Sequence, residues 1–134
     1  MPIIERVEVI DFKYDVKDMG AAFANAHNHV GYVEGSKLSL SKYAIVVECS
    51  DGSRGEYVAL WGGTRPALAQ TLMLESDLPG RDSDQREAFY TEWNRRQCHM
   101  DHMGQGPVDI VLWDLAGKQA GKSISRMIGQ YRNK

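Results

Sequence analysis

The sequence predicts an α+β domain, in which a three-stranded antiparallel meander is followed by a small helical bundle. Two observations lead to this class. Up to residue 61, apolar residues alternate with polar ones or form short runs on either side of one strong turn. From residue 64 onward, apolar residues recur at helical spacing between segments that Gly and Pro interrupt. Strands that precede the helices, instead of alternating with them, are typical of α+β domains.

The first predicted strand has apolar residues at every second position, which is typical of a half-buried strand. These residues are Ile10, Phe12, Tyr14 and Val16, and they alternate with Asp11, Lys13 and Asp15. Val7 and Val9 have the opposite phase, so we expect either a bulge or two covered faces. Residues 18–37 have no periodicity and predict a long loop, and long loops are usually functional or disordered.

Two further strands complete the predicted meander. Residues 38–49 become continuously apolar at 43–47, as expected of a central strand. Ser50-Asp-Gly-Ser53 predicts a hairpin turn, because Asp-Gly readily adopts the positive φ values that tight turns need. Residues 55–61 then return as the third strand.

The first two predicted helices follow Gly62-Gly63. Thr64 is suited to the N-cap and Pro66 to the first turn of the first helix. Its inward face is expected to carry Leu68, Leu72 and Met73. Leu78-Pro-Gly80 ends this helix. Asp82 or Ser83 can cap a second helix, on which Phe89 and Trp93 are neighbours four residues apart.

The third predicted helix opens near Pro107 after the break at 104–106. Its inward stripe is Val108, Leu112 and Leu115, with Val111 alongside, and Gly121 ends it as a left-handed cap. Ser123 starts a short final turn that Gly129 closes.

Four other residues of the third helix indicate specific contacts. Asp114 and Lys118 are expected to pair one turn apart, and Gly117 allows another element to approach closely. Trp113 points away from the inward stripe, so we expect a second apolar contact with something outside this chain. Asp109, Asp114 and Glu92 could suggest paired carboxylates, but charges on a helix surface are usually solvated.

Composition excludes several classes of function. The chain has 134 residues, enough for one domain with a real core. Its net charge of -2 gives no reason to expect a nucleic acid. The longest apolar runs are too short to span a membrane, there is no phosphate loop, and we expect no secretory signal. Two cysteines are too few for a disulfide framework, which makes a reducing cytoplasm the expected location.

The segment 107–129 resembles the signature near the end of the N-terminal domain of the mandelate racemase/muconate-lactonizing enzyme family, a branch of the enolase superfamily. The matching positions are Val108-Asp109, Leu112, Asp114-Leu115, Gly117-Lys118, Ser123-Ile124 and Met127-Ile128-Gly129. Val111 stands where the family usually has Ala, and Pro107 where it usually has a small residue. The upstream order of strands and helices also resembles the capping domain of this family.

This resemblance implies a capping domain over residues 1–129, with 130–134 as the start of a linker into a barrel. Such a barrel needs about 200–250 residues, so it is expected to be absent from this chain. Enzymes of the family abstract a proton alpha to a carboxylate and stabilise the enediolate on Mg²⁺. Their metal ligands and bases lie on the barrel, so the resemblance implies no catalytic residue and no metal ligand here.

The function implied is that of a substrate-specificity domain from a racemase, cycloisomerase or acid-sugar dehydratase, inactive as this fragment. Its partners would be the barrel domain and a small carboxylate or acid-sugar substrate. The alternative is a stand-alone, non-catalytic binding or assembly module derived from such a domain. We expect a homo-oligomer under either hypothesis, because the surface on which a barrel docks would be exposed.

The resemblance also implies which loops would cover the barrel mouth, namely residues 18–37 and 61–64. The substrate-binding candidates on these loops are His27, His29, Tyr32 and Trp61. Each of them could instead be a solvated or locally packed residue. A His-x-His pair also resembles half a metal site, but no third ligand is evident. Cys98 and His102 could hold zinc from one helix end, yet their spacing matches no structural zinc motif.

Overall fold

The computed structural model of the chain describes residues 1–18, 22–23, 30–31, 34–59, 64–130 and 132. The order of its elements is β1 (Ile4–Lys17), β2 (Ala22–Phe23), β3 (Val30–Gly31), β4 (Lys37–Cys49), β5 (Arg54–Val58), α1 (Thr64–Glu75), α2 (Arg86–Arg96), α3 (Gln105–Ala120) and α4 (Ile124–Met127). Strands that come first and helices that come later confirm the predicted α+β class.

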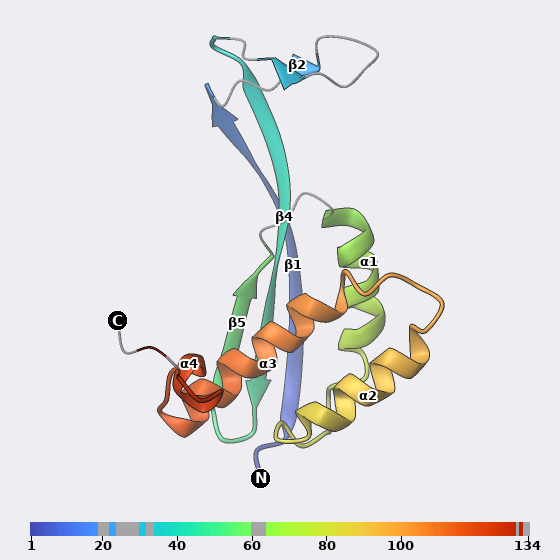
Figure 1. Cartoon of the computed structure of the whole chain (residues 1–134), viewed down its shortest axis with the longest axis vertical. Coiled ribbons are helices and arrows are strands. Elements are labelled where there is room, and N and C mark those ends of the chain that lie inside the picture. The colour runs from blue at the N-terminus through green and yellow to red at the C-terminus, as the bar shows by residue number, and fades with distance from the viewer. Residues whose placement is uncertain (19–21, 24–29, 32–33, 60–63, 131, 133–134) are drawn as a thin grey trace.

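The main sheet is antiparallel with the order β1-β4-β5, so β4 is central as predicted. β1 pairs with β4 as far as Lys17 and Lys37, but β5 pairs only with residues 44–48. The sheet is therefore three-stranded at one end and continues as a two-stranded arm, which we define as residues 11–17 and 37–43. Figure 1 shows the arm extending beyond the helices, with β2 near its far end.

Two predictions about the connections have different outcomes. The turn at 50–53 is confirmed: Gly52 has a φ of +79°, and the Asp51 Oδ1 accepts a hydrogen bond from the Ser53 amide at 2.9 Å. The predicted loop over 18–37 is interrupted, because β2 and β3 pair antiparallel inside it.

The bulge considered for the first strand is not found between Val7 and Val16. The described register shifts only between Ile4 and Arg6, and β1 is otherwise paired residue by residue with β4. Val7 and Val9 pack against the core, whereas Ile10 and the apolar residues after it lie on the opposite face. Both faces of β1 are therefore apolar, but in different halves of the strand.

The core lies between one face of the sheet and the helices α1, α2 and α3 (Figure 1). Its fully buried apolar side chains include Tyr43, Ile45, Val47, Leu74, Leu78, Phe89, Trp93, Val108, Val111, Leu112 and Leu115. The predicted inward stripe of the third helix is thus confirmed. Each such aliphatic or aromatic side chain contributes roughly 1.5–3 kcal/mol when it is removed from water.

The inward face predicted for the first helix is wrong. Leu72 is 46% exposed and Met73 48% exposed, while Thr71 and Leu74 are fully buried and Leu68 is partly buried. The helix turns a polar residue inward because the Thr71 Oγ1 lies 3.0 Å from the buried Tyr43 hydroxyl. The Thr71 hydroxyl can also donate to the Gly104 carbonyl at 3.2 Å. These bonds satisfy the buried polar atoms.

The second helix begins later than predicted, at Arg86, and Gln85 is its N-cap. Asp82 is instead part of a bridge with Ile3, and the Ser83 amide donates to the Pro2 carbonyl at 3.0 Å. The chain's first residues thus hold 82–83 outside the helix. Phe89 and Trp93 lie together as predicted, with stacked rings 5.5 Å apart.

Candidate functional site

The signature helix α3 rests directly on the edge strand β5. A side chain at Gly55 would place its Cβ 2.5 Å from the Val111 carbonyl oxygen and 2.8 Å from the Leu115 Cβ. Only glycine allows this approach, so the motif residues on the inner side of α3 meet the strand backbone itself.

Asp114 fastens the same helix to the same strand. Its Oδ2 accepts a hydrogen bond from the Glu56 amide at 2.8 Å and lies 2.7 Å from the Lys118 Nζ. The hydrogen bond with Asp114 raises the pKa of Lys118. The predicted Asp114–Lys118 pair is confirmed, and it occupies an amide of an edge strand, where such groups would otherwise be open to a foreign strand.

The glycines of the motif shape the end of α3. A Cβ at Gly117 would lie 2.9 Å from the Lys122 carbonyl oxygen, which confirms the predicted close approach. Gly121 has a φ of +61° and its amide caps the helix, as predicted. Ser123 then precedes α4, and Gly129 follows it with a φ of +101°. These motif residues therefore have a structural role: they allow α3 to pack closely on its neighbours, end the helix and reverse the chain direction.

Trp113 is half-buried, and the Arg86 guanidinium of α2 lies 4.8 Å from the centre of its ring. The expected apolar contact with something outside this chain stays a prediction.

The four substrate-binding candidates, His27, His29, Tyr32 and Trp61, lie outside the described residues. Around the first candidate loop the described residues show a closed base. The Asp18 Oδ1 accepts a hydrogen bond from the Gly35 amide at 2.7 Å, and the Asp18 amide donates to the Ser36 carbonyl at 3.0 Å. Asp18 has a φ of +56°, a left-handed conformation that Asp tolerates better than most residues.

The bases of the two candidate loops lie at different levels of the ribbon. The first loop leaves the sheet where Lys17 pairs with Lys37, and the second follows the end of β5, where Val58 pairs with Ala44. Seven residues of extended β4 separate these levels, or about 23 Å. Figure 1 accordingly places β2 at the far end of the arm and α1 near the middle of the molecule.

Among the described residues, no three His, Cys, Asp or Glu side chains gather into a possible metal site. The His102 Nδ1 lies 2.8 Å from the Gln105 Oε1, and Cys98 is an exposed free thiol. The described part of the chain therefore does not fit a Mg²⁺ ion. No helix in the described ranges has the length and apolar character to cross a membrane.

This architecture is that of the N-terminal domain of enolase-superfamily enzymes. The resemblance predicted from residues 107–129 is confirmed, since the curated relatives and structural neighbours are cycloisomerases, dehydratases and mandelate racemase-like proteins of that superfamily. The chain matches the small N-terminal part of these much longer proteins. No family model matches it.

Two curated relatives are a D-galactarolactone cycloisomerase from Agrobacterium fabrum and a 3,6-anhydro-alpha-L-galactonate cycloisomerase from Streptomyces coelicolor. The first is 31% identical over 90 residues, which are 63% of this chain and 24% of the relative. The second is 28% identical over 108 residues, which are 72% of this chain and 29% of the relative. The chain thus spans about a quarter of the length of the curated relatives it matches.

Solved structures share the fold over almost the whole chain. An L-talarate dehydratase from a Polaromonas species, complexed with Mg and L-glucarate, has a TM-score of 0.76 at 17% identity. That match covers 99% of this chain and 36% of the dehydratase chain. A D-glucarate dehydratase from Agrobacterium tumefaciens, complexed with magnesium, has a TM-score of 0.69 at 24% identity and covers 98% and 33% of the two chains.

Proposed function

We propose that residues 1–129 are the capping, substrate-specificity domain of a Mg²⁺-dependent enolase-superfamily enzyme that abstracts a proton alpha to a carboxylate. Residues 130–134 would lead into its barrel. The observation that carries this proposal is the extent of the structural match, which covers 99% of this chain but only 36% of a dehydratase chain. The parent reaction would be a racemisation, a cycloisomerisation or an acid-sugar dehydration.

The proposal divides the work between two parts of the parent enzyme. The barrel would hold Mg²⁺, which stabilises developing negative charge on a substrate carboxylate. The cap would exclude water and contact a small carboxylate or acid-sugar substrate through His27, His29, Tyr32 and Trp61. The arm supports this role, because the base of the first loop lies on it, far from the helical layer, and is closed by the hydrogen bond between Asp18 and Gly35. We also propose a cytoplasmic location, in keeping with the two free thiols Cys49 and Cys98.

The proposal is tested with the chain alone and with a chimera. Residues 1–129 would replace the matching part of the Agrobacterium cycloisomerase, and turnover of a panel of acid sugars and lactones would be measured with Mg²⁺. We expect no turnover from the chain alone, restored Mg²⁺-dependent turnover from the chimera, and a raised KM in the His29→Ala and Trp61→Ala chimeras. A chimera with Lys13→Ser, on the arm but outside the loops, serves as the control.

Robust turnover by the 134-residue chain alone would contradict the proposal. A folded chimera in which the two loop substitutions change neither KM nor substrate preference would contradict the role of the loops.

A second candidate function is that of a non-catalytic assembly module, and one observation favours it. On the sheet face opposite the helices, Ile10 is 44% exposed, Phe12 37% and Tyr14 36%. A two-stranded ribbon is marginally stable by itself, and contiguous exposed apolar surface marks interaction sites. Pairing of this face with a second copy of the chain would give a homo-oligomer.

A further inference from the structure

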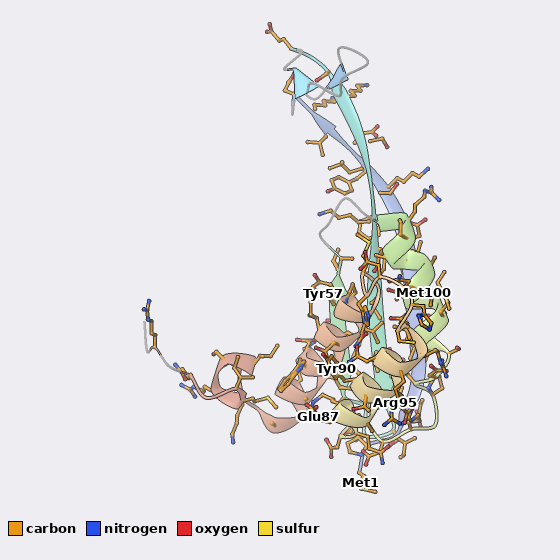
Figure 2. The ribbon with its side chains drawn as sticks, turned by 45° about the vertical axis from the view of Figure 1, so that its right-hand side comes forward. Met1, Tyr57, Glu87, Tyr90, Arg95 and Met100 are labelled. Carbon is orange, nitrogen blue, oxygen red and sulfur yellow. The ribbon has the colours of Figure 1, made fainter. Side chains whose placement is uncertain are left out.

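A hollow of about 410 Å³ lies between α2 and the start of α3. It is lined by Tyr90, Asn94, His102, Gln105, Gly106 and Asp109. Figure 2 shows Tyr90 and Glu87 at the border between these two helices. The candidate loops of the capping function contribute no residue to this lining, so the hollow is independent of the proposed function.

Asp109 brings an uncompensated charge into this hollow. Among the described residues, its carboxylate has no hydrogen-bond or ion-pair partner, although the residue is only partly exposed. Burial raises the pKa of Asp109, and the nearby Glu87 carboxylate raises it further. The Arg86 guanidinium, which lies over the Trp113 ring, lowers the pKa of Asp109 but offsets only part of this increase. A half-buried carboxylate without a partner is unfavourable, and a cation in the hollow would relieve it.

The rest of the lining suits a flat, delocalised cation. The half-buried Asn94 carries an amide oxygen as a second acceptor, and the half-exposed Tyr90 lines the same hollow. A guanidinium group can donate to a carboxylate through two nitrogens and also lie against an aromatic ring. A compact ammonium would use the carboxylate but not the planar surroundings.

Gly106 lines the hollow from the α3 side. It lies within α3, where glycine costs about 0.5–1 kcal/mol relative to alanine. Yet a Cβ at this position would meet no described atom within 4 Å. The neighbouring Gly104 is different, because a Cβ there would lie 2.4 Å from the Gln70 Cβ. Packing within the described chain thus explains why residue 104 is glycine, but it does not explain why residue 106 is.

We propose that this hollow binds one guanidinium group, with the Asp109 carboxylate as its counter-ion, the Tyr90 ring alongside and the Asn94 amide oxygen as a further acceptor. The group could belong to a free alkylguanidinium compound or to an arginine side chain of a docked polypeptide. Both sources present the same chemistry to the hollow.

The test is an amide NMR titration of the chain with propylguanidinium chloride at constant ionic strength. We expect saturable shifts of the amides around residues 90–94 and 105–109. Asp109→Asn should weaken binding about tenfold, the usual effect of losing one charge-assisted hydrogen bond. Asp84→Asn, which changes an exposed carboxylate outside the hollow, should leave the affinity unchanged. Gly106→Leu should block entry while the remaining amide spectrum stays native.

A capped Gly-Arg-Gly peptide distinguishes the two sources of the guanidinium group. An affinity ten times that of propylguanidinium would identify an arginine side chain as the occupant, and equal affinities a free small cation. Shifts that sodium chloride reproduces, or that persist unchanged in Asp109→Asn, would overturn the site.

Discussion

At the scale of single residues, the two aspartates of the signature helix have different roles. Both are charges on a helix surface, where side chains are usually solvated, although the sequence also predicts Lys118 as a partner of Asp114. In the structure the Asp114 carboxylate binds the Glu56 amide and the Lys118 ammonium, whereas Asp109 has no partner among the described residues. The difference arises from what each side chain meets: Asp114 reaches an edge strand, and Asp109 faces a hollow.

The unpaired carboxylate of Asp109 makes stability depend on pH. Its pKa is raised in the folded chain, so the folded state holds this proton more tightly than the unfolded state. The corresponding stability is present below the unfolded pKa of 3.8 and is lost as the pH rises through the folded pKa. The groups around it are Glu87, Arg86 and His102.

Asp109→Asn, which mimics the protonated form, should therefore stabilise the chain at pH 7 and have little effect at pH 3. Urea unfolding of both proteins at the two pH values measures this difference. A variant that is less stable than the parent at pH 7 would show that the carboxylate is paired.

At the scale of elements, the contact between α3 and β5 depends on the missing side chain of Gly55. The stripe of α3 could be predicted from its spacing, because apolar residues three and four apart share one side of a helix. The partner of that stripe, β5, could not be predicted, since a single glycine such as Gly55 in a short strand has several structural explanations.

Gly55→Ala should destabilise the chain by roughly 1–3 kcal/mol, because its Cβ must displace α3. Gly106→Ala is the matched control: it meets no described atom, and we expect it to be neutral or stabilising by up to about 1 kcal/mol. Thermal and urea unfolding compare the two. Equal stabilities would mean that α3 does not rest on this strand.

At the scale of the whole molecule, the helices cover one face of the sheet and leave the other apolar. The same strand serves both faces, with Val9 toward the core and Ile10 and Phe12 away from it. Beyond β5 the arm carries charged residues on the helix side, such as Lys13 and Asp15, and apolar residues on the opposite side. The helices of this chain therefore leave the apolar side of the arm exposed.

If that surface is a second copy, Phe12→Ser should weaken self-association about tenfold, because it removes one buried aromatic side chain from the interface. Lys13→Ser, on the other face of the same strand, should have no effect. Sedimentation velocity from about 1 to about 100 µM, a range in which weak complexes dissociate, measures both. A parent chain that remains monomeric throughout would contradict the assembly hypothesis.

The sequence by itself determined the class of the fold, the central strand, the turn at 50–53, the stripe of α3 and its left-handed cap at Gly121. These features depend on local spacing and turn chemistry, which residues close in sequence settle among themselves. The resemblance at 107–129 was readable for the same reason, since its residues form one helix and the turn after it. The candidate contacts on the two loops stay predictions, because His27, His29, Tyr32 and Trp61 lie outside the described residues.

Only the tertiary structure decided which faces of α1 and β1 are buried. Spacing tells which residues share a face, but the partner of that face comes from a distant segment. Thr71 points inward instead of Met73 because the Tyr43 hydroxyl on β4 meets it there. Val9 and Ile10 point to opposite faces because successive residues of a strand alternate, and Val9 packs against the core because the helices cover its face. The hollow around Asp109 likewise exists only because α2 and α3 pack side by side.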